Sequence, residues 1–293
     1  MRQRLPEWIK RGIINTETTK RVRNILTAHK LNTVCDSARC PNKNECYSNN
    51  TATFLIMGST CTRNCRFCSV NSGIPSLLDP DEPFHIAQAV EELGLKYVVI
   101  TSVTRDDLKD GGAEHFAKTI SAVKNISADI KVEVLTPDFQ GNKDSILTVI
   151  SAKPDVFNHN IETVKNSYSK VRPQAEYTRS LELLRFVKES APDIYTKSGI
   201  MVGLGETFSD LKETLQDLKD NNCDIVTIGQ YIQPTKQHVD VERYLTLEEF
   251  DDLKNLGIKA GLRHVESGPL VRSSYNAGNV VKNLSSCTCS TIV

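Results

Sequence analysis

An alternation of short strand-like runs with amphipathic stretches, starting near residue 51, limits most strongly what this chain can fold into. Strands are expected at 53–57, 96–101, 131–135, 156–161, 198–202 and 224–232. Helices are expected near 82–93, 112–125, 143–151, 178–190, 208–221 and 246–260. Strands that alternate with helices in this way form consecutive βα units around a parallel sheet.

The number of βα units predicts the architecture within the α/β class. A closed TIM barrel needs eight units, and six are visible here. The pattern therefore favours a partial (βα)6 TIM-like barrel, with a doubly wound open sheet as the alternative. In either fold, the loops that follow the strands are expected to carry the chemistry.

Two segments fall outside this alternation and suggest a three-part organisation. Residues 1–50 form an N-terminal arm with one expected helix near 16–29 and a cysteine-rich loop. Residues 51–261 contain the barrel, and residues 262–293 form a C-terminal tail with weak periodicity. Both extensions are expected to cap the barrel mouth.

Charge and hydropathy exclude two classes of function. The 36 Lys and Arg residues balance 36 Asp and Glu residues, whereas a protein held by phosphate contacts needs a basic excess. No apolar run approaches the roughly 20 residues of a membrane-spanning helix. We therefore expect neither nucleic acid nor membrane among the partners.

The cysteines are numerous and clustered. Six of the nine fall between Cys35 and Cys68, and an odd number in a chain of this size argues against a disulfide framework. Metal binding in a reducing compartment is the better interpretation. No secretory signal is visible, so a cytoplasmic location is expected, although the mildly basic N-terminal segment leaves an organelle open.

The sharpest motif is the spacing of Cys61, Cys65 and Cys68, directly after the first expected strand. Thiolates are soft ligands suited to zinc and to iron–sulfur clusters, and a structural zinc site needs four ligands. Three cysteines on one loop can hold three irons of a [4Fe–4S] cluster and leave the fourth iron open. The spacing therefore favours a catalytic cluster over a zinc loop.

A second triplet precedes the first and consists of Cys35, Cys40 and Cys46. Again three thiolates converge without a fourth local ligand. Taken alone, zinc would explain this triplet about as well as a second cluster.

The loop from Cys61 to Cys68, with Phe67 before its last cysteine, resembles the radical S-adenosylmethionine (SAM) superfamily. With both triplets in this order, the chain resembles the lipoyl synthase family within it. The resemblance covers nearly the whole chain. It extends to motifs at 105–113, 157–163, 171–173, 199–206, 230–235 and 272–275, the last reading Arg-Ser-Ser-Tyr.

The resemblance implies two [4Fe–4S] clusters with different functions. Cys61, Cys65 and Cys68 would hold the cluster that cleaves SAM. The second triplet would hold an auxiliary cluster that donates sulfur, with Ser274 as its fourth ligand and Ser273 as the fallback. A serine oxygen is a harder, poorer iron ligand than a thiolate, which suits an iron that must be released.

The remaining site predictions concern SAM itself. Gly111 and Gly112 are expected to let the backbone approach SAM closely, and Asn160, Glu162 and Arg172 are the candidates for contacts with its ribose or carboxylate. Several residues are expected to have no catalytic role. His159 is predicted to be a packed histidine and Cys223 a buried thiol, and Cys287 and Cys289 are predicted to lie in a frayed tail.

The implied reaction is the insertion of two sulfur atoms at carbons 6 and 8 of an octanoyl chain on a lysine of a lipoyl carrier domain, with two SAM consumed. Implied partners are the 2-oxoacid dehydrogenase E2 subunits, the glycine cleavage H protein, a ferredoxin- or flavodoxin-type reductant and an iron–sulfur carrier that rebuilds the auxiliary cluster. A radical SAM enzyme of the biotin synthase type and a non-catalytic zinc scaffold are the rival interpretations.

Overall fold

One open sheet organises the molecule. The computed structural model describes residues 6–9, 16–49 and 51–287, and within them the main sheet has eight strands. Seven strands run parallel to their neighbours, in the same order in space as in the chain. They are β2 (Thr53–Ile56), β5 (Tyr97–Ser102), β6 (Lys131–Leu135), β7 (Val156–Asn158), β8 (Tyr195–Val202), β9 (Ile225–Gln230) and β10 (His264–Gly268).

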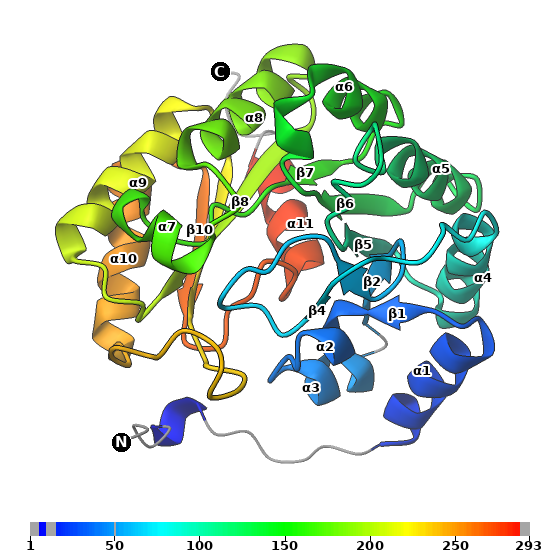
Figure 1. Cartoon of the computed structure of the whole chain (residues 1–293), viewed down its shortest axis with the longest axis horizontal. Coiled ribbons are helices and arrows are strands. Elements are labelled where there is room, and N and C mark those ends of the chain that lie inside the picture. The colour runs from blue at the N-terminus through cyan, green and yellow to red at the C-terminus, as the bar shows by residue number, and fades with distance from the viewer. Residues whose placement is uncertain (1–5, 10–15, 50, 288–293) are drawn as a thin grey trace.

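Helices cover the outer face of this sheet. Figure 1 shows them as an arc outside the strands. They are α4 (Glu82–Leu93), α5 (Ala113–Lys124), α6 (Lys143–Ser151), α8 (Tyr177–Ser190), α9 (Phe208–Asp220) and α10 (Leu247–Lys259). Helices α9 and α10 each begin with a capping box, from Thr207 and Thr246, which satisfies backbone N–H groups that have no partner inside the helix.

The core lies between the strands and these helices. Phe54, Ile100, Val134 and Phe157 from four strands are fully buried, as is Phe116 of α5. Parallel strands covered on both faces bury side chains in both directions. This is why the strands read as continuous apolar runs in the sequence.

The predicted partial (βα)6 barrel is confirmed, and each expected strand and helix matches an observed element closely. The seventh parallel strand, β10, was not predicted, because residues 262–293 were expected to lie outside the alternation of strands and helices. The main sheet also crosses both expected part boundaries, since β1 (Asn32–Thr33) pairs with β2 and β10 pairs with β9. The division at residues 50 and 261 itself stays a prediction.

The two edges of the sheet, β1 and β10, lead directly into the two extensions. Strand β1 continues into α2 (Val34–Ser37) and α3 (Lys43–Ser48), and β10 continues into a loop at 269–276. The extensions are hydrogen-bonded to each other: Asn42 Nδ2 donates to the carbonyl of Leu270 at 2.6 Å, and Tyr275 donates to Glu45 at 2.9 Å. The segments at 42–45 and 270–275 thereby contact each other between the two edges of the sheet.

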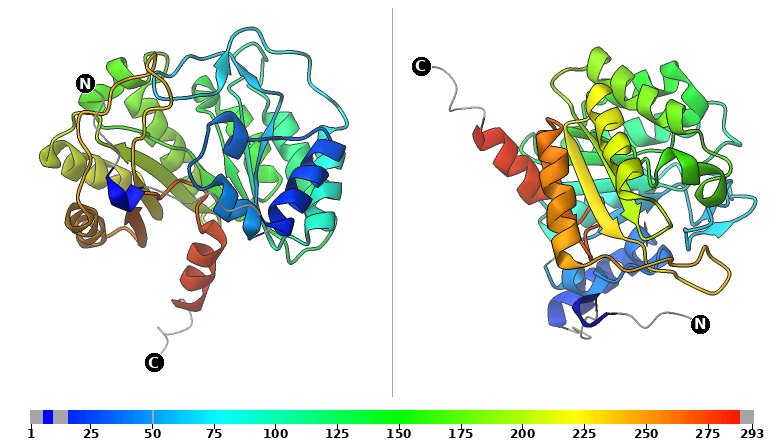
Figure 2. Two further views of the ribbon diagram at one scale, coloured as in Figure 1. Left: turned by 90° about the horizontal axis from the view of Figure 1, so that it is seen from below. Right: turned by 90° about the vertical axis from the view of Figure 1, so that its left-hand side faces the viewer.

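The final helix, α11 (Ala277–Cys287), lies at the other end of the strands. A Cβ at Gly278 would stand 3.2 Å from the side chain of Tyr97, the first residue of β5. Figure 2 shows α11 projecting from the side opposite the loop that follows β2. The cap on the loop side is therefore made by residues 269–276, and α11 lies beyond it.

The interior of the barrel contains a buried ion pair. Lys197 Nζ of β8 lies 2.9 Å from Glu133 Oε1 of β6, and both side chains are almost completely shielded from solvent. Asn158 and Tyr97 also donate to the Glu133 carboxylate, at 3.0 and 2.7 Å. These bonds satisfy a carboxylate that would otherwise be costly to bury.

Among the helices of the described residues, none combines the length and the apolar composition that a membrane-spanning helix needs.

Candidate active site

A cavity of about 520 Å³ opens at the carboxyl ends of the strands. Both cysteine triplets line it, together with residues from the loop after β10. Of the predicted site residues, it brings together Cys35, Cys40, Cys46, Cys61, Cys65, Cys68, Asn160, Glu162, Arg172, Ser273 and Ser274.

The loop that carries Cys61, Cys65 and Cys68 is anchored at its N-terminal end to the loop after β5. Thr62 N donates to the carbonyl of Thr104 at 3.0 Å, and Asp106 N donates to Thr62 Oγ1 at 3.1 Å. The sulfur of Cys61 accepts a hydrogen bond from Thr104 N at 3.3 Å. The cysteine loop and the loop after β5 therefore form one unit.

The C-terminal end of the cysteine loop is anchored to two further segments. Arg66 N donates to the carbonyl of Val171, and the carbonyl of Arg66 accepts from Val239 N, at 3.0 and 2.9 Å. His238 Nε2 donates to the carbonyl of Cys68 at 2.8 Å. Hydrogen bonds on both sides therefore fix the cysteine loop to the neighbouring segments.

A buried ion-pair network lies beneath this loop. Arg63, only 6% exposed, contacts Asp106 through two hydrogen bonds of 2.6 and 2.9 Å and Asp138 through one of 2.6 Å. Burial alone would raise the pKa of Asp138, but the hydrogen bond and charge of Arg63 hold it well below its usual range. Arg63 therefore ties the cysteine loop to the loops after β5 and β6.

The second triplet lies on two short helices of the N-terminal arm. Cys35 is in α2, Cys46 is in α3, and Cys40 lies between them. Asn42, 1% exposed, accepts from Cys46 N through its carbonyl at 2.9 Å and donates from its side chain to Leu270. The fold of this triplet thus depends on the loop after β10.

That loop passes close to the strands because of two glycines. A Cβ at Gly229 of β9 would overlap the carbonyl oxygen of Val271, and one at Gly199 of β8 would lie 2.8 Å from Ser273 Oγ. Only glycine leaves this space. The Arg-Ser-Ser-Tyr segment is thereby brought to the cavity, opposite the second triplet.

Burial affects the ionisation of three of these thiols. Burial raises the pKa of Cys35 to about 11 and that of Cys68 to about 12, and it also raises the pKa of Cys65. Such thiols are ionised only beside a compensating positive charge. The donor set therefore fits thiolate-bound iron.

Within residues 6–9, 16–49 and 51–287, no three His, Cys, Asp or Glu side chains gather closely enough to bind one metal ion. Cysteine thiolates are also the usual ligands of [4Fe–4S] clusters.

The rest of the cavity offers polar atoms to a ligand. Ser102 Oγ, Thr136 Oγ1 and Arg172 Nε line it and have no hydrogen-bond partner within the described part of the chain. Buried polar atoms are normally paired. These atoms therefore fit a zwitterionic ligand such as SAM, although contacts to SAM stay a prediction.

Gly111 and Gly112 are not among the residues that line the cavity. Both have positive φ angles, of 61° and 87°, and Gly112 precedes α5. A Cβ at Gly112 would overlap the sulfur of Met57, and one at Gly111 would stand 3.0 Å from the Phe139 ring. Backbone conformation and packing explain these glycines without SAM, and their predicted contact with it stays untested.

Two residues expected to have no catalytic role are buried and hydrogen-bonded, although His159 also lines the cavity. His159 is 1% exposed and hydrogen-bonded to the Thr136 carbonyl and to Ser180, at 2.9 and 3.0 Å. Cys223 is 3% exposed, and its thiol contacts the carbonyl of Ile225 at 3.3 Å. Cys289 and the side chain of Cys287 lie outside the described residues.

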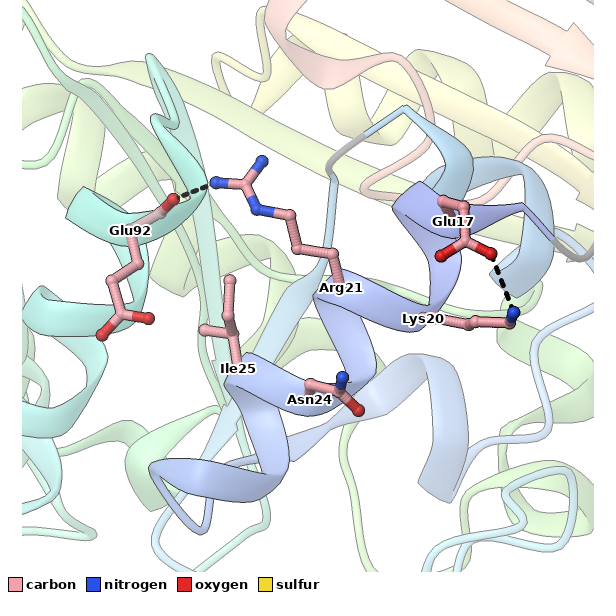
Figure 3. A pocket seen from close by; sticks show the side chains of 6 residues that line it. All are labelled: Glu17, Lys20, Arg21, Asn24, Ile25 and Glu92. Carbon is pink, nitrogen blue, oxygen red and sulfur yellow. Dashed lines mark hydrogen bonds and ion pairs between the residues drawn. The ribbon is translucent and has the colours of Figure 1, made fainter.

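A second depression lies on the outer surface, between α1 (Glu17–Ala28) and α4 (Figure 3). Arg21 donates from its guanidinium to the carbonyl of Glu92 at 2.5 Å, close to the C-terminal end of α4. A cation at a helix C-terminus is favoured by the helix dipole. This depression is open and contains no cysteine of either triplet, so it is a packing feature rather than a second site.

The fold and the cysteine loop define a radical SAM enzyme. The model of the radical SAM superfamily matches residues 55–218, more than half of the chain. A lipoyl synthase of Caldanaerobacter subterraneus subsp. tengcongensis is 56% identical over 277 residues, which are 94% of this chain and 97% of that one. A lipoyl synthase of Rubrobacter xylanophilus is 52% identical over 272 residues, which are 93% and 85% of the two chains. The chain therefore belongs to the lipoyl synthase family, and its cofactors are SAM and [4Fe–4S] clusters.

Solved structures support the fold. Methylornithine synthase aligns over 94% of both chains with a TM-score of 0.53 and 16% identity. Streptococcus suis SuiB bound to S-adenosylmethionine aligns over 78% of this chain and 54% of its own, with a TM-score of 0.58 and 13% identity. Membership of the lipoyl synthase family decides against both rival interpretations, a non-catalytic zinc scaffold and an enzyme of the biotin synthase type.

Proposed function

We propose that this chain inserts two sulfur atoms into an octanoyl group, at carbons 6 and 8, while that group is attached to a lysine of a lipoyl carrier domain. The observation that carries the proposal is the shared cavity, which both cysteine triplets and the two serines line. A radical formed at one cluster can reach the sulfur of the other only within a common chamber.

Each triplet has its own task in this proposal. Cys61, Cys65 and Cys68 hold the cluster that binds and cleaves SAM, and Cys35, Cys40, Cys46 and Ser274 hold the auxiliary cluster. When bound, the two clusters and SAM supply hydrogen-atom abstraction and sulfide. Because two C–H bonds are broken, two SAM are consumed for each product.

The need for a radical follows from the substrate. Carbons 6 and 8 of an octanoyl chain are remote from the carbonyl, so no side chain has a pKa suited to removing their protons. The protein contributes position and exclusion of water. Here the bonds from Arg63 to two aspartates and from Asn42 to Leu270 anchor the two thiol-bearing segments that line the cavity.

The substrate and partners follow from the same proposal. Octanoylated E2 subunits of 2-oxoacid dehydrogenases and the glycine cleavage H protein would deliver the octanoyl chain. A ferredoxin- or flavodoxin-type reductant would supply electrons. An iron–sulfur carrier would rebuild the auxiliary cluster, and the cytoplasm is the proposed compartment.

Two cysteine variants test whether one triplet serves SAM cleavage and the other serves sulfur donation. The protein is purified and assayed without oxygen, with SAM and an octanoyl-lysine peptide. Cys65→Ala should abolish 5′-deoxyadenosine formation while the auxiliary cluster remains. Cys40→Ala should still form 5′-deoxyadenosine but yield no peptide in which two hydrogens are replaced by two sulfurs, as read by mass spectrometry.

The wild-type protein serves as the control and should carry about eight irons per chain. Sulfur-containing product from Cys40→Ala would contradict the assignment of the donor. A colourless, zinc-rich wild-type protein would contradict the whole proposal.

A further inference from the structure

Two consecutive side-chain hydrogen bonds connect the loop after β10 with the end of β7. Ser273 Oγ donates to Asn160 Oδ1 at 2.8 Å, and Asn160 Nδ2 donates to Glu162 Oε1 at 3.0 Å. All three residues line the cavity. Because the two ends of the Asn160 amide have different partners, its orientation is fixed by Ser273 and Glu162 together.

Gly199 makes room for the first of these bonds. A Cβ at position 199 would lie 2.7 Å from Asn160 Oδ1 and 2.8 Å from Ser273 Oγ, closer than side-chain carbons come to such atoms. The φ angle of Gly199 is not in the left-handed region, so this position needs glycine for space rather than for its backbone. The bond between Ser273 and Asn160 occupies a notch in β8.

The backbone of Glu162 is held independently of its side chain. Glu162 N donates to the carbonyl of Gly199, and the Glu162 carbonyl accepts from Met201 N, both at 2.8 Å. Its φ angle of 68° is unusual for a residue other than glycine and marks a site where the surroundings enforce the conformation. With the backbone fixed to β8, the carboxylate is held by its bond to Asn160 and by the charges of Arg172 and Arg272.

The two adjacent serines, Ser273 and Ser274, both line the cavity. The hydroxyl of Ser273 donates to Asn160. This bond anchors the segment at the position directly before Ser274.

We propose that Ser273 is a positioning residue, which holds Ser274 in register with the SAM side of the cavity through Asn160 and Glu162. This inference rests on the proposed function, in which Ser274 binds the auxiliary cluster, and on the prediction from the sequence that Asn160 and Glu162 contact SAM. The hydrogen bonds then keep the sulfur donor and the radical source at a fixed separation, which a reaction between two bound groups requires.

The test compares four variants of the cluster-loaded protein: Ser273→Ala, Gly199→Ala, Ser274→Ala and Gly268→Ala. Gly268 is the matched control, because a Cβ there would meet its nearest neighbour, Val271, at an ordinary 3.4 Å. For each variant, iron content, thermal midpoint and SAM affinity are measured, the last by calorimetry with oxidised clusters so that no turnover occurs. The ratio of sulfur-containing peptide to 5′-deoxyadenosine is measured separately.

Ser273→Ala should keep its iron and its thermal midpoint but bind SAM roughly three- to tenfold more weakly, the effect of one neutral hydrogen bond. Its ratio of product to 5′-deoxyadenosine should fall by a similar factor. Gly199→Ala should show the same two defects, and combining it with Ser273→Ala should add little, because both changes remove the same bond. Gly268→Ala should match the wild type.

Unchanged SAM affinity and an unchanged ratio in Ser273→Ala would overturn the proposal. So would a loss of iron in Ser273→Ala as large as that in Ser274→Ala, because Ser273 would then be a ligand. If Gly199→Ala folds and keeps the wild-type SAM affinity and the wild-type ratio of product to 5′-deoxyadenosine, the space at Gly199 has no role in positioning. Full iron content and full product in Ser274→Ala would instead refute the ligand assignment in the proposed function, a result separate from the others.

Discussion

The packing of Gly112 against Met57 yields a prediction whose size can be worked out from the structure. In Gly112→Ala, the new methyl group would overlap the Met57 sulfur, and the φ angle of 87° would strain the backbone. A left-handed conformation costs a residue other than glycine about 1–2 kcal/mol, and overpacking adds about 1–3 kcal/mol. The variant should therefore lose roughly 2–5 kcal/mol of the free energy of unfolding.

A second glycine separates the two contributions. Gly94 ends α4 with a φ angle of 66°, and a Cβ there would meet nothing within 4 Å. Gly94→Ala should therefore show only the backbone cost of about 1–2 kcal/mol. Urea unfolding without oxygen, followed by far-UV circular dichroism at matched iron content, measures both variants.

A double-mutant cycle completes the test. In a Met57→Ala background the space beside Gly112 is vacated, so Gly112→Ala should cost only about 1–2 kcal/mol there. Equal costs for Gly94→Ala and Gly112→Ala, or no relief from Met57→Ala, would refute the packing argument. If Gly112→Ala weakened SAM binding equally in both backgrounds, the predicted contact between this glycine and SAM would regain support.

Two further predictions concern buried charges. Lys197→Met should destabilise the protein by about 3–5 kcal/mol, because it leaves the Glu133 carboxylate buried without its cation. In urea unfolding, the double variant with Glu133→Gln should recover much of this loss of stability. Additive losses from the two substitutions would contradict the argument. Burial lowers the pKa of His159 to about 4, below the usual value near 6.5, so the unfolded chain binds a proton before the folded chain does as the pH falls. Stability should therefore decline by about 1 kcal/mol between pH 7 and pH 5.5, and His159→Gln should reduce that decline, whereas identical pH profiles for the two proteins would argue against it.

The sequence predicted what depends on local pattern. Cys61, Cys65 and Cys68 lie within eight residues on one loop, so their spacing alone identified a cluster motif. The barrel strands are short apolar runs bounded by polar loops, which made their number and order visible. Strand β10 was missed because its sequence, His-Val-Glu-Ser-Gly, is mostly polar, and only one of its five residues is buried.

The contacts that hold the site together could not be predicted, because they join residues far apart in the chain. Arg63 meets partners 43 and 75 positions away, and Ser273 meets Asn160 across 113. Gly199 and Gly229 gave no local signal, since a glycine inside a strand shows only that something approaches closely. What approaches, the segment at 270–275, is visible only in the folded protein.

The bridge between the N-terminal arm and the loop after β10 has a consequence for biosynthesis. Asn42 and Leu270 are separated by 228 positions, and Glu45 and Tyr275 by 230. While the ribosome is still translating, the early cysteines exist without the wall against which they settle. On the proposed assignment of a cluster to the second triplet, stable loading of that cluster should require the complete chain, and chains truncated before residue 270 should not retain it.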